Sequence, residues 1–340
     1  MWKPSSSRGR VAIPDAFDSE TNWPKCAKVI GDIRDQSACG CCWAFGAAEA
    51  ASDRLCIATN GTVAVPLSAQ ATCFCAQDQG CNGGQLQTAW SFISNEGVVT
   101  GGQVNSSGPF NSKGLCSAFS LPHCHHHGPV GSDPYPSEGT TGCPNVNASP
   151  QCPTTCDAGA KSPYNDFNKD KYQFTGSIQT FNGEADDIAQ AIMEHGPVEA
   201  AFTVYSDFEN YAGGIYHATS TKSLGGHAIR IVGWGVEGGV KYWKVANSWN
   251  PFWGEKGYFR IKRGTDEAGI EDEVVVSSGT SAWVGPGITP KPPGPATPGN
   301  CGDQQNQAQC LSTSTGGKRC SWCVLKGLGI GICQNPSEAC

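Results

Sequence analysis

In the first half of the chain, apolar residues recur every three or four positions, which is the period of an amphipathic helix. The pattern predicts helices over 43–57 and 85–96, and a further helix over 185–195 in the second half. Ser68 is a candidate N-cap for another helix between the first two. Helix-ending residues follow these segments: Asn60-Gly61, Gly97 and Gly196-Pro197. The apolar face of the first helix comprises Phe45, Ala48, Ala51 and Leu55.

The second half of the chain is rich in strand-forming residues. Val, Ile, Phe, Tyr and Trp are frequent in four segments bounded by glycines, and that composition is typical of β-strands. The segments are 197–205, 226–236, 240–248 and 256–262. A helical half followed by a strand-rich half indicates a mixed, α+β fold.

Composition and charge restrict the possible partners. The 340 residues carry a net charge of −7, with a pI near 5.5, which argues against nucleic acid or an anionic membrane as the main partner. Apolar runs of 18 residues are absent from the sequence, so we expect no membrane span. The length suffices for one large domain or two small ones.

Nineteen cysteines indicate oxidising surroundings and many disulfides. Three glycosylation sequons, which also occur by chance, support a secretory route only mildly. They begin at Asn60, Asn105 and Asn147, and Pro150 weakens the last. Residues 1–12 are polar and contain no apolar stretch of the kind that a signal peptide needs. We interpret them as a propeptide remnant or a cloning residue.

The C-terminal part differs in composition from the rest. Residues 285–299 contain six prolines and four glycines, which suits a semi-rigid linker. Residues 300–340 contain six cysteines, which predicts a module with three disulfides in one of 15 connectivities. A metal knuckle is the alternative, but the oxidising context and the absence of histidine favour disulfides. Cys320-Ser321-Trp322-Cys323 faintly resembles small extracellular modules of the plexin–semaphorin–integrin type, and its partner is unknown.

The segment from Asp35 to Phe45 contains the strongest chemical motif, Cys-Gly-Cys-Cys-Trp-Ala-Phe. It resembles the active-site segment of papain-family cysteine peptidases. The resemblance makes Cys42, directly before Trp43, the nucleophile, and it assigns Gln36 to the oxyanion hole. A cysteine that begins a helix is favoured as a thiolate by the helix dipole. The alternative is a buried structural cysteine.

Two downstream motifs supply the expected partners of Cys42. Gly-Gly-His-Ala-Ile around His227 resembles the family's histidine strand, and Asn-Ser-Trp from Asn247 resembles its asparagine turn. The resemblance implies that His227 forms a thiolate–imidazolium pair with Cys42 and protonates the leaving amine, while Asn247 orients the ring and Trp249 shields it. It also implies a papain-like fold with a helical left lobe, a β-barrel-like right lobe and the active-site cleft between them.

From Ile13 to about Val276 the chain resembles the cathepsin B group, so we expect a peptidase domain over 13–284. Gly83 and Gly84 resemble the segment that pairs with an extended substrate, although glycines also form plain turns. Glu273 resembles the acidic floor of the second subsite, which can accept arginine, or it is one more solvated acid. The remaining residues that the resemblance places at this subsite are Leu86, Ala201, Gly226 and Ala228.

Residues 116–156 resemble the occluding loop of cathepsin B, with the run His-Cys-His-His-His from His123. The resemblance implies that His126 pairs with Asp35 as a latch and that His127 holds the C-terminal carboxylate of a substrate. A zinc site in the cluster is the rival interpretation. The basic residue of a second latch is missing, and Phe252 stands where its acidic partner would be. We therefore expect a single latch and a loop that opens more readily.

The resemblance also implies a disulfide framework for the peptidase domain. The expected bonds are Cys26–Cys56, Cys39–Cys81, Cys73–Cys152, Cys116–Cys156 and Cys124–Cys143. Cys41 is a departure, because the family usually has a small Ser or Ala there. Counting then permits a Cys41–Cys75 bond, which only geometry can decide.

Together these motifs predict a cysteine peptidase that combines endopeptidase and dipeptidyl carboxypeptidase activity on peptide and protein substrates. We expect no cofactor and no metal. The resemblance implies regulation by its own propeptide or by cystatin-like inhibitors, and a lysosomal, vacuolar or secreted location. A catalytically silent protein that keeps the cleft and presents the C-terminal module is the alternative. A secreted structural protein rich in disulfides is the third possibility.

Overall fold

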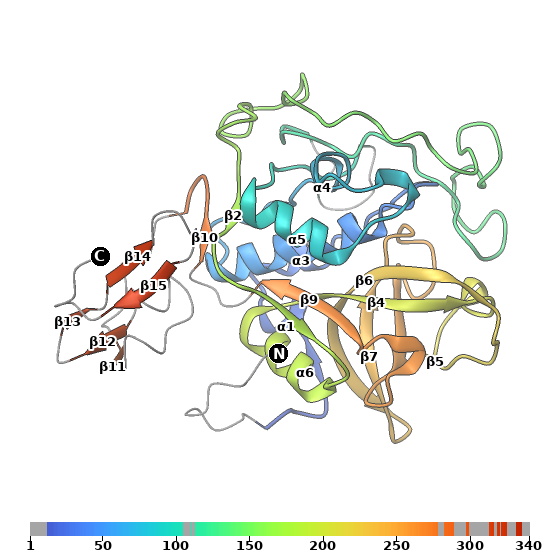
Figure 1. The fold of residues 1–340 in the computed structure, drawn as a ribbon. Helices are drawn as coiled ribbons and strands as arrows, with labels where there is room; N and C mark the ends of the chain where they lie inside the picture. The colour runs from blue at the N-terminus through green and yellow to red at the C-terminus, as the bar shows by residue number, and fades with distance from the viewer. Residues whose placement is uncertain are drawn as a thin grey trace. The chain divides into compact units, whose positions relative to one another are not determined.

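A computed structural model describes residues 12–104, 110, 113–277 and 282–288, together with the backbone of five short strands nearer the C-terminus (Figure 1). The helices are α1 Ser19–Asn22, α2 Ala27–Ile30, α3 Cys42–Ala58, α4 Ala69–Cys75, α5 Leu86–Asn95 and α6 Ala185–His195, with single 3-10 turns η1 Gly80–Asn82, η2 Phe208–Asn210 and η3 Glu267–Gly269. The strands of the first unit are β1 Phe17–Asp18, β2 Gln173–Phe174, β3 Ile178–Phe181, β4 Val198–Tyr205, β5 Ile215–Tyr216, β6 Ser223–Glu237, β7 Val240–Ala246, β8 Tyr258–Lys262, β9 Glu273–Ser277 and β10 Trp283–Val284.

The chain divides into two compact units, 1–288 and 289–340. The first unit includes 285–288, which were expected to belong to the linker, because β10 pairs with β2 and Ile288 packs against the core. The second unit contains β11 Thr297–Pro298, β12 Thr313–Thr315 and β13 Lys318–Arg319 in one small sheet, and β14 Ser321–Val324 paired with β15 Gly331–Gln334. The cysteines of the expected C-terminal disulfides lie outside the residues whose side chains the structure describes.

Helix α3 is the central element of the first unit. Every residue from Trp43 to Cys56 is buried, which is more than the single apolar face that was expected. A helix without an exposed polar face belongs in an interior, and here α4 and α5 cover one side of α3 while β4 and β6 cover another. Five buried alanines within α3 allow these neighbours to approach closely.

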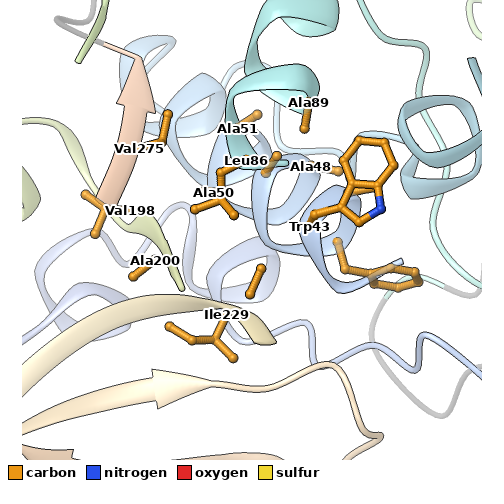
Figure 2. Packing of buried hydrophobic residues seen from close by; sticks show 14 of the residues in the cluster. Trp43, Ala48, Ala50, Ala51, Leu86, Ala89, Val198, Ala200, Ile229 and Val275 are labelled. Carbon is orange, nitrogen blue, oxygen red and sulfur yellow. The ribbon is translucent and has the colours of Figure 1, made fainter. Parts of the chain in front are cut away.

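Figure 2 shows that packing from close by. Ala48, Ala50 and Ala51 of α3 lie between Leu86 and Ala89 of α5 on one side and side chains of the sheet on the other. The sheet contributes Val198, Ala200, Ile229 and Val275. The two halves of the peptidase unit thus share one hydrophobic core, which fixes the start of α3 relative to the sheet.

The strands of the second half form one sheet with the order β3-β9-β4-β6-β7-β8-β5, and β1 pairs with β6 beside this path. Neighbouring strands are antiparallel except for β5 and β8. The expected barrel-like lobe is therefore wrong in one respect, because the sheet stays open with β3 and β5 as separate edges. β6 bends at a register shift near Gly233, and a bulge of this kind lets a long strand curve over the core.

The four helices predicted from the sequence are present at α3, α4, α5 and α6, and the four predicted strands at β4, β6, β7 and β8. The Ser68 hydroxyl accepts a hydrogen bond from the Ala71 N–H, as an N-cap does. The long segment between α5 and β2, green in Figure 1, has no regular helix or strand among its described residues. Within the described residues no helix is both long and apolar enough to cross a membrane.

Candidate active site

Cys42 is the first residue of α3 and the only free cysteine among the described residues. It lines a cavity of about 540 Å³ together with Gln36, His227 and Trp249. The preceding segment is held in place by backbone bonds such as Gln36 N–H to the Ser248 carbonyl at 2.8 Å. Three expected catalytic side chains thus meet at one cavity: Cys42 at the start of α3, Gln36 from the segment before it, and His227.

His227 lies on β6 and Asn247 directly follows β7. The distance from His227 Nε2 to Asn247 Oδ1 is 2.8 Å. The same oxygen accepts a hydrogen bond from the Ser248 N–H at 2.8 Å, which fixes the orientation of the amide. Nε2 is therefore the protonated nitrogen of the ring, and Nδ1 is left for a second partner. The Trp249 ring stacks on the imidazole with 4.8 Å between ring centroids, and it shields the hydrogen bond from water.

Burial acts on both members of the Cys42–His227 pair. It raises the pKa of the Cys42 thiol, although the backbone N–H groups of Ala228 and Trp43 oppose this. Burial also lowers the pKa of His227 to about 4, and the hydrogen bond to Asn247 only partly offsets it. Each group considered alone therefore favours its neutral form. A preformed ion pair, as expected from the sequence, gains support from the helix dipole and the backbone N–H groups rather than from the solvation of either group.

Gln36 is positioned by two side-chain hydrogen bonds. Its Oε1 accepts from the Ser248 hydroxyl at 2.6 Å, and its Nε2 donates to the Cys39 carbonyl at 2.9 Å. An amide nitrogen carries two hydrogens, so one N–H of Gln36 remains for an oxyanion in the cavity. The side chain is buried and rigidly held, which is what an oxyanion donor requires.

Gly83 and Gly84 line the same cavity, and local structure explains both identities. Gly83 has φ of +112°, a conformation that side chains with a Cβ rarely adopt. At Gly84 a Cβ would collide with the indole ring of Trp43. The glycines are thus required by the turn itself, whether or not a substrate pairs with them.

Three of the residues expected at the second subsite lie side by side on the sheet, Gly226 lies further along β6, and Leu86 is the buried first residue of α5. Ala201 of β4 pairs with Ala228 of β6 and with Glu273 of β9, so the three side chains share one face. Glu273 is half-buried there, unlike its neighbour Asp272, which is exposed. A second carboxyl group that sequence reasoning missed is Glu199. It is buried against Trp90 Nε1 at 2.8 Å, and burial raises its pKa well above the usual value.

Four of the five expected disulfides of the peptidase unit are present: Cys26–Cys56, Cys39–Cys81, Cys116–Cys156 and Cys124–Cys143. The expected Cys73–Cys152 bond is wrong, and so is the permitted Cys41–Cys75 bond. The structure instead pairs Cys41 with Cys73 and Cys75 with Cys152. Residues two apart on a helix point to nearly opposite faces. Cys73 of α4 therefore faces the core and Cys41, while Cys75 faces outward to the exposed Cys152.

Each histidine of the loop faces a carboxylate, and His123 shares that of Asp35 with His126. His126 Nε2 lies 2.7 Å from Asp35 Oδ1, so the expected pair is present. His125 Nδ1 lies 2.8 Å from Asp133, and His127 Nδ1 lies 3.3 Å from Glu209. Because these three histidines point to different partners, they do not converge on one ion. The one candidate metal-ligand group among the described residues is Cys39, Cys41 and Cys73, whose sulfurs are all in disulfides.

Carboxylates set the charge of His126. Burial alone would lower its pKa, but Asp35 and Glu138 outweigh burial and raise the pKa to about 9. Asp35 is buried as well, yet His126, with hydrogen bonds from His123 and the Ser37 N–H, holds its pKa well below the usual range. His127 behaves differently, because burial lowers its pKa and Glu209 only partly compensates.

The expected single latch is wrong, because further contacts fasten the loop. Tyr135 of the loop packs edge-on against Phe252, with 5.9 Å between ring centroids. An aromatic contact thus involves Phe252, the residue that stands where the family pattern has the acidic partner of a second latch. His127 reaches Glu209 in η2, and Asn147 donates to the Ser37 hydroxyl at 3.0 Å. Because two disulfides also close the loop, less chain entropy opposes its closure than its length suggests.

The chain matches the model of the papain family of cysteine proteases over residues 13–278 and belongs to that family. It is 47% identical over 268 residues to a cathepsin B-like cysteine proteinase of Schistosoma japonicum, covering 78% of this chain and 73% of that protein. It is 46% identical over 267 residues to cathepsin B-like cysteine proteinase 4 of Caenorhabditis elegans, covering 77% and 74%. Procathepsin B S9 of Trypanosoma congolense has a similar structure, with TM-score 0.63 and 31% identity over 79% of this chain and 78% of that chain.

These likenesses and the cavity agree on the class of protein. The chain is a cysteine peptidase of the cathepsin B-like type, with a papain-like, mixed helix-and-sheet fold. The silent binding protein and the structural protein, which were the alternatives from sequence, are not favoured.

Proposed function

We propose that this peptidase cleaves peptide chains internally and also removes dipeptides from free C-termini, through a Cys42–His227 pair. One observation carries the proposal. His126 and His127 of the loop line the same cavity as Cys42 and His227, so the latch histidine and an imidazole that can meet a carboxylate, that of His127, lie at the cavity of the nucleophile. An open-ended cleft would accept a long chain on both sides, whereas this one is narrowed by the loop.

The first half of the reaction acylates Cys42. Its thiol proton passes to Nδ1 of His227, and the thiolate sulfur forms a bond to the scissile carbonyl carbon. The negative oxygen is stabilised by the free N–H of Gln36 and the backbone N–H of Cys42. The imidazolium then donates its proton to the leaving amine, the C–N bond breaks, and an acyl-enzyme remains.

The second half returns the enzyme to its starting state. Neutral His227 takes a proton from water, whose oxygen attacks the thioester, and the C–S bond breaks as Cys42 regains its proton. Each half begins with a neutral imidazole that accepts a proton, and the low pKa of His227 favours that neutral form. Asn247 keeps the ring in the tautomer that faces the sulfur.

The dipeptidase part follows from the charge of the loop. His126 stays protonated up to about pH 9, so its pair with Asp35 holds the loop throughout the physiological range. His127 has a lowered pKa and becomes an imidazolium only in acid. Binding of a C-terminal carboxylate to His127 should therefore strengthen as the pH falls, while the latch itself does not change.

The test compares one peptide with a free and with an amidated C-terminus between about pH 4.5 and pH 7.5. Wild type should favour the free terminus in acid by about tenfold, the order expected for a charged hydrogen bond, and lose the preference towards neutral pH. His127→Ala should cleave both forms equally. Equal rates on both forms in wild-type enzyme at acid pH would contradict the dipeptidase role.

Regulation and location are proposed from family likeness. The solved relative is a proenzyme, which supports an inhibitory propeptide for this chain as well, and cystatin-like inhibitors are expected to block the same cleft. Six disulfides in the peptidase unit support a secretory route to a lysosome, a vacuole or the exterior. Of the sequons, exposed Asn60 is the better glycosylation site, because the Asn147 amide is engaged with Ser37 and Ala38.

The second compact unit is proposed to localise the enzyme rather than to shape its cleft. Its described strands form two small sheets of their own, β11–β12–β13 and β14–β15. Truncation after Ile288 should leave kcat/KM on short peptides within about threefold, because the cavity lining lies entirely in the first unit. A loss of activity well beyond this range would contradict the separation.

A further inference from the structure

Glu209 in η2 extends from the strand-rich half towards the loop. Its Oε1 lies 3.3 Å from Nδ1 of His127, and the two side chains are 36% and 32% exposed. Trp249 contacts both segments, with its ring 4.7 Å from the His127 ring and 5.9 Å from that of Phe208. Glu209 therefore lies beside the histidine that is proposed to hold the substrate's C-terminus.

This arrangement creates a conflict of charge. Glu209 contacts Nδ1 of His127, so a substrate carboxylate would bind the other N–H of the imidazolium, at Nε2, and two carboxylates would share one cation. On the loop, Glu138 adds a further negative charge, 3.5 Å from Nδ1 of His126. The other titratable groups that act on His127 or respond to it are three histidines, listed here: His125, His126 and His227. A dipeptide with neutral side chains would thus leave two carboxylates on the single positive charge of His127, with one negative charge in excess.

A basic side chain in the departing dipeptide resolves the conflict. We propose that Glu209 receives a Lys or Arg side chain on the primed side, so that the enzyme preferentially removes dipeptides that carry a basic residue. The substrate carboxylate then pairs with His127 while its cation pairs with Glu209. This inference deepens the proposed dipeptidase function and rests on it for the position of the substrate's terminus.

The size of the preference follows from exposure. A hydrogen bond between charged groups is stronger than a neutral one, but a pair that is one-third exposed is weakened by water. We expect a preference of about 3–10-fold in kcat/KM for arginine over citrulline, its neutral isostere, at the first or the second primed position. Both positions are tested, because the substrate's path across η2 decides which side chain reaches Glu209.

The experiment uses peptides in arginine and citrulline pairs, each with a free or an amidated C-terminus. The variants are Glu209→Gln and, as a matched control, Glu237→Gln, whose carboxylate pairs with Arg260 rather than with a histidine of the loop. The arginine preference should fall below about twofold in Glu209→Gln and stay at the wild-type value in the control. Thermal melting of both variants checks that each is folded.

Three results would overturn the inference. They are an absence of arginine preference at both positions in wild type, a preference that survives in Glu209→Gln, and an equal change on arginine and citrulline peptides, which would make Glu209 only a latch for the loop. The free-to-amidated ratio tests the dipeptidase function separately. If that ratio is one while the arginine preference depends on Glu209, the primed-side carboxylate is supported and the dipeptidase function fails.

Discussion

Two buried histidines at the same cavity have opposite charge behaviour. His126 and His227 are 4% and 6% exposed, and burial alone lowers the pKa of both. His126 nevertheless has a pKa of about 9, whereas that of His227 is about 4. The difference lies in the partner on Nε2, which is the carboxylate of Asp35 for one and the amide of Asn247 for the other.

The comparison shows how one cleft combines a permanent cation with a base. A carboxylate stabilises the imidazolium, so His126 can hold the loop at any physiological pH. An amide fixes the orientation of the ring without fixing its charge, so His227 can accept a proton and return it. The division of roles follows from partner chemistry, with the carboxylates of Asp35 and Glu138 at His126 and the amide of Asn247 at His227.

The largest effect should come from removing Cys42, the proposed partner of Nδ1 of His227. Cys42→Ala should abolish labelling by a thiol-reactive epoxide and all peptide hydrolysis, because the described part of the chain offers no other free thiol. Cys41→Ser should retain labelling while costing about 2–5 kcal/mol of stability through the lost bond to Cys73. Labelling of Cys42→Ala, or its loss in Cys41→Ser, would place the nucleophile elsewhere.

Asp35→Asn would make the His126 site resemble that of His227. Removing one partner of a buried ion pair costs about 3–5 kcal/mol, and the loop should detach. A raised folded pKa means that His126 stabilises the fold fully below pH 6.5, and that this contribution is lost as the pH rises through about 9. Melting temperatures should therefore fall over that range in wild type and lose this slope in Asp35→Asn. If melting temperature falls with pH as steeply in Asp35→Asn as in wild type, a group other than His126 titrates.

Asn247→Asp makes the reverse exchange, because it gives His227 a carboxylate partner like that of His126. A carboxylate on Nε2 should raise the pKa of His227 and keep the ring protonated, so that it cannot act as a base in acid. We expect kcat near pH 5 to fall by about 10–100-fold and the acid limb of the rate profile to move upward. Asn247→Ala serves as the control, because loss of the hydrogen bond should lower the rate while the pKa of His227 falls, so the limb should not move upward.

The smallest effect concerns a pair of carboxyl groups. Glu199 is buried and kept neutral by burial, whereas Glu273 lies half-buried at the proposed second subsite. Glu273→Gln should lower kcat/KM for substrates with arginine two residues before the cleavage site, by an amount that corresponds to about 1–3 kcal/mol of transition-state stabilisation. Substrates with phenylalanine there should hardly be affected. Equal losses on both substrates would remove Glu273 from the pocket.

Much of this structure could be predicted from local patterns. Helical and strand periods, together with glycine and proline, located α3, α5, α6 and the long strands, because a packed face imposes its period on the sequence. The roles of Cys42 and His227 could also be predicted, because each residue lies within a short motif of neighbouring residues. The open sheet was missed, because closure depends on strand register rather than on the character of any strand.

The contacts of the loop could not be predicted in the same way. Glu209 and Tyr135 belong to segments without a regular period, and their partners are distant in sequence. The correct pairing of Cys73 and Cys75 was within reach, since residues two apart on a predicted helix face opposite sides. Cys73 is the buried one of the two because α4 packs against α3. That packing is tertiary structure, which no local sequence pattern contains.

The contrast between the two histidines can be measured directly by NMR titration of isotope-labelled histidine in Cys42→Ala, in which no thiolate perturbs the ring. The account predicts that His126 titrates near pH 9 and His227 near pH 4, and that Asp35→Asn in this background lowers only the first. A higher pKa of His227 in wild type than in Cys42→Ala would report the thiolate–imidazolium pair. If both rings instead titrate near the unperturbed value of about 6.5, partner chemistry does not set their charge and the account is wrong.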